Sequence, residues 1–309
     1  MHVIVSLNTE LSLYDLEDLK MKKKLVAALT LAGVLLMPVS AWADAAVGDQ
    51  IVTIGTNLND QQRQEVLKYF GAKDNAQIIS VDISEERQYL SGKVPDAQIG
   101  NSTNSCAMIT YTKAGSGIEV FTNNINYVSA DAYGSALLTA GVNDAQVKVT
   151  APFEVSGTGA LTGIMKAYEV STGKPISEDV KQAATNELVT NAELSNQIGD
   201  EKANALINDI KERVAKEQPK DAESVKKIVD DVLKDYNITL TDEQYQQLLD
   251  MIDQLSKLDI DWNQLAQNLQ HFAGQASDYL KSEEGQKTMG QLQSLINQFF
   301  DWLRSVFSN

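Results

Sequence analysis

Apolar residues recur with helical spacing through the second half of the chain. From residue 203 onward they lie three and four positions apart, as they do along one face of an α-helix. Because each apolar stripe must be buried against another element, the pattern predicts an all-α helical domain over residues 174–309. The five stripes are Ala203, Leu206, Ile207, Ile210 and Val214; Val225, Ile228, Val229, Val232 and Leu233; Tyr245, Leu248, Leu249, Ile252 and Leu255; Trp262, Leu265, Leu269, Phe272, Ala276 and Leu280; and Leu292, Leu295, Ile296, Phe299, Phe300 and Leu303.

The first half has a different composition and predicts a mixed fold. Thirteen of the seventeen glycines after residue 43 lie before Pro175. Strands are expected at Gln50–Gly55 and Gln77–Ile83, and between them a helix capped by Asn59 or Asp60 should end at Gly71. Strands that interleave with helices favour an α+β fold, a mixed αβ sandwich domain over residues 44–173, over a parallel nucleotide-binding sheet.

Local turn and capping signals predict further elements. Two β-rich runs around Ala114-Gly115-Ser116-Gly117 predict a hairpin over Ser105–Asn124. Ser129 should cap a helix over Ala130–Ala140, with Val128 and Tyr133 in the hydrophobic-staple positions and Gly141 at its end. A strand is expected over Ala145–Pro152. Pro219 should lie in the first turn of a helix, and Thr241 and Gln244 have the spacing of a capping box at the start of another.

Residues 1–43 predict an upstream extension followed by a cleaved signal peptide at residues 21–43. Three lysines, Lys22 to Lys24, precede the apolar run Leu25–Met37, and an Ala-x-Ala pattern ends at Ala43. The run is too short to span a bilayer, which takes about 20 apolar residues. We expect cleavage after Ala43 and a secreted, extracellular protein with no stable membrane anchor; translation from Met21 is a hypothesis.

The net charge limits the classes of partner, and the cysteine content limits the covalent cross-links, that the chain can have. The formal net charge of −16 disfavours nucleic acids and anionic lipids, since like charges repel. The single cysteine, Cys106, excludes a disulfide within the chain. An unknown protein or small molecule outside the cell is the expected partner.

Three segments of the first half carry a family resemblance: "IVTIGTNLNDQQRQEVLKYFG", "YLSGKVPDAQIGNSTNSCAMITYT" and "NINYVSADAYGSALLTAGVNDAQVKVTAPFEVSGTGALTGIMKAYE". They resemble the exported bacterial family, from Firmicutes, of domain of unknown function 1002 (DUF1002). The resemblance covers most of the chain after residue 43 and is strongest before Pro175. It implies export and a two-part layout, and it brings no activity and no catalytic residues.

A glycine-rich helix start offers a candidate anion or ligand site at Ser156, Gly157, Thr158 and Gly159. Ser156 or Thr158 can cap the helix, and its first backbone N–H groups would favour a carboxylate or phosphate group. The spacing matches neither the dinucleotide fingerprint nor the P-loop. Close packing of the glycines against the preceding strand is the alternative.

Two side-chain pairs invite catalytic interpretations that the pattern does not support. Cys106 lies in an alternating strand and His271 in a helical stripe, so a buried thiol and a helix-surface histidine are expected instead of a nucleophile and its base. Ser224 and Lys227 lie on the polar side of an amphipathic helix. We predict no catalytic residue and no cofactor.

The segment from Asp259 begins like a calcium loop, with Asp261 and Asn263 at the third and fifth positions. Gln264 replaces the glycine and Gln270 replaces the bidentate glutamate that such a loop needs. Helix capping by these acids is therefore expected, and no metal site.

The last helical stripe offers a candidate partner-binding surface at Phe299, Phe300, Trp302 and Phe307, with packing as a final core helix as the alternative. Together these patterns favour a secreted, non-enzymatic binding protein, extracellular or envelope-associated, of unknown ligand. An extracellular hydrolase of unknown substrate class is the alternative.

Overall fold

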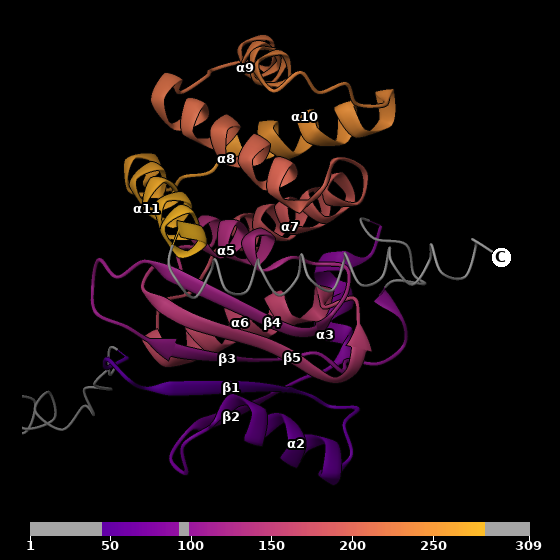
Figure 1. The fold of residues 1–309 in the computed structure, drawn as a ribbon, viewed down its shortest axis with the longest axis vertical. Helices are drawn as coiled ribbons and strands as arrows, with labels where there is room; N and C mark the ends of the chain where they lie inside the picture. The colour runs from indigo at the N-terminus through magenta and orange to yellow at the C-terminus, as the bar shows by residue number, and fades with distance from the viewer. Residues whose placement is uncertain (1–44, 93–98, 282–309) are drawn as a thin grey trace, which may run out of the picture. The chain divides into compact units, whose positions relative to one another are not determined.

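The computed structural model describes residues 45–92 and 99–281 and has an α+β fold, as the sequence predicts (Figure 1). The signal peptide and the candidate surface at Phe299–Phe307 lie outside the described residues. A mixed five-stranded sheet has the order β2-β1-β3-β5-β4. Its strands are β1 (Gln50–Gly55), β2 (Gln77–Val81), β3 (Cys106–Tyr111), β4 (Ile118–Ile125) and β5 (Ala145–Val155).

The predicted hairpin between β3 and β4 is wrong. β5 lies between these two strands, antiparallel to β3 and parallel to β4. Val147 and Val149 of β5 are fully buried, which suits a strand with neighbours on both sides, whereas Ile118 is the one buried residue of β4 and the rest of that strand is exposed or partly buried. The glycine-rich turn residues mark where the chain leaves β3, but they carry no information about which strand then pairs with it.

Helices α2 (Asp60–Phe70) and α3 (Ile83–Leu90) follow the first two strands. Asn59 caps α2 through a complete capping box, and Gly71 ends it with a φ of 64°. The strand expected to reach Ile83 ends at Val81, because Asp82 accepts hydrogen bonds from the amides of Ser84 and Glu85 and so starts α3.

Helices cover the two faces of the sheet differently. On one face α2 buries Val66 and Phe70 against Val52, Ile54 and Met108, with Cys106 in the same small cluster. The opposite face carries α5 (Ala130–Thr139) over β4 and α6 (Thr158–Thr172) over β1, β2 and β3. Ser129 caps α5 and both staple residues next to it are buried, as predicted.

The second half adds α7 (Glu178–Ile198), α8 (Asp200–Glu217), α9 (Ala222–Asp235), α10 (Asp242–Ser256) and α11 (Trp262–Lys281). Four of these follow the predicted stripes, and Thr241 and Gln244 form the expected capping box of α10. Asp221 is the N-cap of α9, so Pro219 precedes the helix instead of lying in its first turn. The sequence stripes did not reveal α7, whose buried positions include several polar residues.

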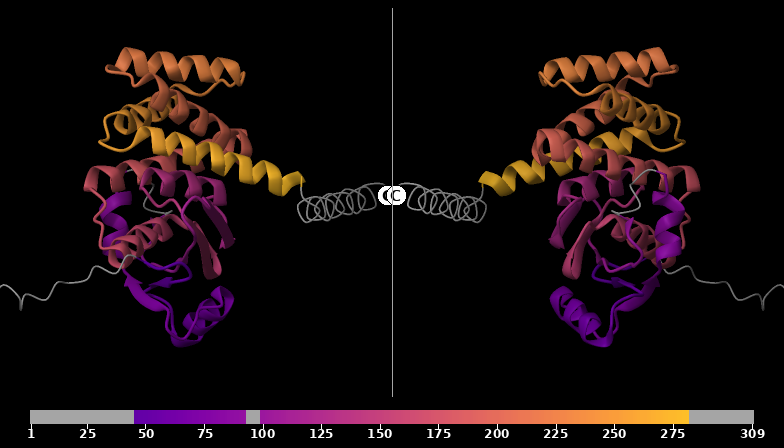
Figure 2. Two further views of the ribbon diagram at one scale, coloured as in Figure 1. Left: turned by 90° about the vertical axis from the view of Figure 1, so that its left-hand side faces the viewer. Right: turned by 90° about the vertical axis from the view of Figure 1, so that its right-hand side faces the viewer.

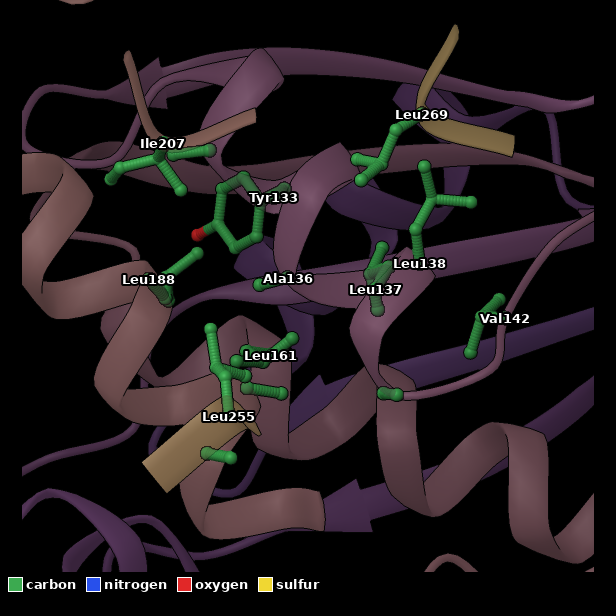
Figure 3. Packing of buried hydrophobic residues seen from close by; sticks show 14 of the residues in the cluster. Tyr133, Ala136, Leu137, Leu138, Val142, Leu161, Leu188, Ile207, Leu255 and Leu269 are labelled. Carbon is green, nitrogen blue, oxygen red and sulfur yellow. The ribbon is translucent and has the colours of Figure 1, made fainter. Parts of the chain in front are cut away.

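One hydrophobic cluster runs from the sheet through α5 and α6 into the later helices. In the side views the sheet, α5 with α7, and the helices beyond follow one another as layers (Figure 2). Figure 3 shows one part of this cluster, where side chains from six helices converge: Leu137, Leu161, Leu188, Ile207, Leu255 and Leu269. The predicted domain boundary at residue 173 is therefore not confirmed. Within the described part of the chain, every helix is too short or too polar to cross a lipid bilayer.

Candidate functional site

The glycine-rich helix start is the N-terminus of α6. Its N-cap is Gly157, with a φ of 90°, and no side chain caps the helix. The expectation that Ser156 or Thr158 caps it is wrong, because a left-handed glycine makes the turn and Thr158 is already the first helical residue. Thr158 and Gly159 are buried, while Ser156 is partly buried.

A carboxylate of the protein itself lies at this helix start. Glu86 of α3 is 4% exposed and accepts hydrogen bonds from the hydroxyls of Thr103 (3.1 Å) and Thr158 (3.2 Å). A Cβ atom on Gly159 would lie 2.4 Å from Oε2 of Glu86, so only glycine lets the carboxylate come this close. A carboxyl group of the protein thus lies where the sequence predicts an external anion. Ligand binding at Ser156, Gly157, Thr158 and Gly159 stays a prediction.

Glu86 should make stability depend on pH. Burial raises the pKa of Glu86 above its ordinary value of 4.5. A raised pKa in the folded state means that its contribution to stability is full below pH 4.5 and declines as pH rises through the folded pKa. We expect the free energy of unfolding of the wild type, relative to Glu86→Gln, to fall above pH 4.5 by up to about 1.4 kcal/mol per pH unit. Urea unfolding of both proteins between pH 4 and 8 measures this, and parallel profiles would contradict it.

A second buried network joins α5, α7 and α8. Nζ of Lys211 lies 2.7 Å from Oε1 of Glu187, and the two side chains are 1% and 0% exposed. The hydroxyl of Thr139 donates to Oε2 of Glu187 (2.6 Å), and that of Ser135 lies 2.5 Å from Oε1. Burial lowers the pKa of Lys211, and Glu187 opposes that shift.

The same network brings Ser135 within 2.9 Å of Nζ of Lys211, the distance of a nucleophile from its general base. Both side chains are enclosed by three helices, with Ser135 0% exposed. In this conformation no substrate carbonyl can reach the hydroxyl. The network therefore satisfies buried polar groups and holds the three helices in register.

The other sequence candidates lie apart from any cluster of converging groups. Cys106 is buried in β3, and burial raises the pKa of its thiol to about 11, which suits an unreactive side chain. His271 is exposed on α11, and Ser224 and Lys227 are exposed on α9. Asp261 accepts a hydrogen bond from the amide of Gln264 (2.9 Å), as expected of a helix cap. Among the residues the structure describes, no three His, Cys, Asp or Glu side chains are grouped to hold a metal ion.

Two adjoining hollows form where the end of the sheet meets the helical layers. We call them the sheet hollow, between β3, the start of the described chain and α6, and the helix hollow, between α5, α7 and α11. Each has a volume of about 390 Å³. Gly141, Asn143, Tyr168 and Lys174 line both, so the two hollows share a wall.

Polar atoms without partners lie at these hollows. In the described part of the chain, three buried side-chain polar atoms have no hydrogen-bond partner: Oγ1 of Thr112, the hydroxyl of Tyr127 and Nδ2 of Asn268. Thr112 lines the sheet hollow and Asn268 the helix hollow. Each such atom costs about 1–3 kcal/mol of desolvation that is not recovered within the protein. Both atoms have under 1 Å² of accessible surface, so a ligand could bond to them only after the walls move. The paired hollows are the candidate site because side chains from several distant segments meet around them.

The charges around the hollows are of both signs. Lys174 lies in the shared wall, Asp259 and Asp261 line the helix hollow, and Asp144 lines the sheet hollow. Two of the three carboxylates are already hydrogen-bonded: Asp144 accepts from the amide of Gly117 (2.9 Å), and Asp261 caps α11. The site thus combines a modest acidic excess with hydroxyl, amide and aromatic groups.

Sequence reasoning did not find this site. Thr112 lies within the predicted hairpin, Asn268 lies on the polar side of a predicted helix, and Asp259 is expected only as a helix-capping acid. No local pattern relates these positions, since the fold alone brings together segments far apart in the chain.

Replacing the hydroxyl of Thr112 should not weaken the fold. Thr112→Val keeps the shape of the side chain and removes an atom that has no partner, so we expect the free energy of unfolding to be unchanged or to rise by about 0.5–1 kcal/mol. Thr139→Val is the matched control: it removes a hydroxyl bonded to Glu187 and should cost about 1–3 kcal/mol. Chemical denaturation of both variants measures the difference, and equal losses would show that the Thr112 hydroxyl is satisfied in the folded protein.

The geometry defines an α+β protein with two adjoining open hollows, lined by both polar and apolar side chains, between a sheet end and a helical layer. The chain belongs to the family described as protein of unknown function (DUF1002), whose model matches residues 54–272. It is 44% identical over 289 residues to the uncharacterized protein YpuA of Bacillus subtilis (strain 168), covering 93% of this chain and 100% of that protein. No solved structure matches.

Proposed function

We propose that this chain is an exported, non-enzymatic protein, extracellular or envelope-associated, that binds a small polar ligand in the paired hollows. The observation that carries the proposal is a pair of adjoining hollows, each of about 390 Å³, that share a wall made by Gly141, Asn143, Tyr168 and Lys174. Natural binding sites combine a largely preformed cavity with a few polar groups that fix the ligand's orientation.

Export rests on the order of features before residue 44: a basic patch, an apolar run and a small-residue cleavage pattern. We expect the mature protein to be recovered from the medium or the envelope fraction and to begin Asp44-Ala45-Ala46. A chain in the cytosol that still carries residues 21–43 would contradict export.

The ligand-binding proposal is tested with a library of small polar compounds against ¹⁵N-labelled protein. Binders should shift the amide signals of Gly141, Asn143 and Lys174. Tyr168→Ala should raise the dissociation constant of each binder by at least about tenfold. Tyr236→Ala, a change to an exposed tyrosine that caps the C-terminus of α9 and lines neither hollow, is the control and should leave binding unchanged. A library without binders would refute the proposal, and shifts confined to residues 156–159 would move the site to the start of α6.

The alternative of an extracellular hydrolase would need a reachable nucleophile. The best pairing of nucleophile and base in the described residues, Ser135 with Lys211, is enclosed on all sides. Binding is therefore the function that we favour over hydrolysis.

Two further parts of the proposal rest on the sequence. We propose a sandwich domain at residues 44–173 joined to a helical domain at residues 174–309. We also retain Phe299, Phe300, Trp302 and Phe307 as a surface for an unknown protein partner. Nucleic acids and anionic membranes are disfavoured partners because of the acidic charge.

A further inference from the structure

The described chain begins in the wall of the sheet hollow, which Ala45 and Val47 line. Backbone hydrogen bonds attach the residues that follow to the end of β3. The amide of Gly48 donates to the carbonyl of Tyr111 (2.8 Å), and the amide of Tyr111 donates to the carbonyl of Asp49 (3.1 Å). The residue before Ala45 is one peptide unit away, about 3.8 Å between Cα atoms, and is therefore within reach of the same hollow.

Removal of the signal peptide would change the charge at this point. Cleavage after Ala43 turns the backbone amide nitrogen of Asp44 into a free amino group. An α-amino group has an ordinary pKa of about 7.7–8.0, so it is positively charged at neutral pH, whereas the amide of the precursor is uncharged. Cleavage thus adds one cation beside the hollow, and the net charge of −16 attracts it.

Two features of the sheet hollow favour a positive charge. The first is the carboxylate of Asp144, which lines the hollow. Its Oδ1 accepts a hydrogen bond from the amide of Gly117 (2.9 Å), and a carboxylate has sites for about four. The second is the C-terminus of α6, because its last residue, Thr172, also lines the hollow. The carbonyl end of a helix favours cations, and the last turn of α6 contains no basic residue.

Other titratable groups limit the strength of this attraction. Lys174 lines the hollow as a second cation and already has an interaction within the protein. Tyr111 and Tyr168 line it too, and burial raises the pKa of Tyr111 to about 12. The carboxylate of Asp49 accepts a hydrogen bond from the amide of Ala46 (2.8 Å). We therefore expect a modest rise in the pKa of an amino group placed there.

We propose that the sheet hollow receives the mature N-terminus of the same chain, with the α-amino group of Asp44 paired with the carboxylate of Asp144. This inference rests on the cleavage after Ala43, which belongs to the proposed function, and adds what the new N-terminus binds. Signal-peptide removal then completes one wall of the hollow, because the mature protein has an ion pair there that the precursor lacks.

The test uses proteins released in vitro from a cleavable fusion, so that it does not depend on export. Three proteins begin at Asp44: the wild type, Asp144→Asn, and the control Asp231→Asn, which changes an exposed acid on α9. An NMR pH titration of the Cα signal of residue 44 gives the pKa of the α-amino group. We expect this pKa to be at least about 0.5 pH units higher in the wild type than in Asp144→Asn, about a threefold greater affinity for the proton. The control should match the wild type.

Acetylation of the amino group of Asp44 supplies a readout that needs no substitution in the fold. A pKa raised in the folded state gives stability that is full below the unfolded pKa and is lost as pH rises through the folded pKa. The urea midpoint of the unmodified protein should therefore exceed that of the acetylated protein at about pH 6.5 and equal it above about pH 9.5.

The outcomes separate this inference from the proposed function. Equal α-amino pKa values in the wild type and Asp144→Asn, or equal urea midpoints at about pH 6.5, would overturn the pairing and leave export and ligand binding standing. If the exported protein begins at a residue other than Asp44, the cleavage assigned under the proposed function is wrong, and the inference fails with it.

Discussion

Lys211→Met will destabilise the protein by about 3–5 kcal/mol. The substitution removes the ammonium group that lies 2.7 Å from Glu187 and leaves that carboxylate charged among three helices, where its side chain is 0% exposed. A buried charge without its partner costs far more than the pair contributes. Urea denaturation at pH 7, followed by circular dichroism, measures the loss.

The double variant Glu187→Gln/Lys211→Met distinguishes this cause from lost packing. A neutral glutamine can still be hydrogen-bonded by Thr139 and Ser135, so the double variant should recover more than half of the stability that Lys211→Met loses. If the double variant is as unstable as the single one, the packing of the lysine chain and not the uncompensated charge carries the effect.

Gly159→Ala will cost about 3 kcal/mol, the upper end for overpacking. The new methyl group would lie 2.4 Å from a carboxylate oxygen of Glu86. Hydroxyls of Thr103 and Thr158 hold this carboxylate, so it cannot turn aside without breaking hydrogen bonds inside the protein. Thermal unfolding monitored by calorimetry gives the change.

A double-mutant cycle with Glu86→Ala identifies the neighbour that the methyl group meets. In a Glu86→Ala background the same glycine substitution should cost at least about 1 kcal/mol less than in the wild type, because the colliding carboxylate is gone. Additive effects would mean that Gly159 is required for another reason, such as the path of the backbone into α6.

Features that depend on a few consecutive residues could be predicted from the sequence. Asn59, Ser129 and Thr241 each cap the helix expected of them, because a cap needs only a side-chain oxygen and an amide two or three residues later. The α+β class also follows from local patterns, since period-2 and period-3.6 stretches alternate along the first half.

Features that depend on distant contacts could not be predicted. The insertion of β5 between β3 and β4 depends on its hydrogen bonding to both of those strands, which the sequence of β5 alone does not record. Helix α7 escaped detection because Glu187 and Asn191 occupy buried positions where an apolar residue was expected. Their partners, Lys211 and Asn204, lie on α8, so the polar positions make sense only once the two helices are packed.

The candidate site could be predicted from the sequence only in part, for the same reason. The sequence predicts that Asp259 and Asp261 cap a helix, and Asp261 does cap α11. The relation of Thr112 to Asn268 exists only in the folded molecule. The walls of the hollows include the end of β3, the loop between α5 and β5, two interhelical connections and one face of α11.

The order of the strands also bears on when the protein can fold during its synthesis. Among the described strands β4 pairs only with β5, and β3 has β5 as one of its two neighbours. A nascent chain that has emerged only to residue 144 therefore carries two strands with open edges, and no local hairpin can close them. Such a chain stays incomplete until Ala145–Val155 leaves the ribosome, so the sheet can close only after half of the chain's 309 residues have been synthesised.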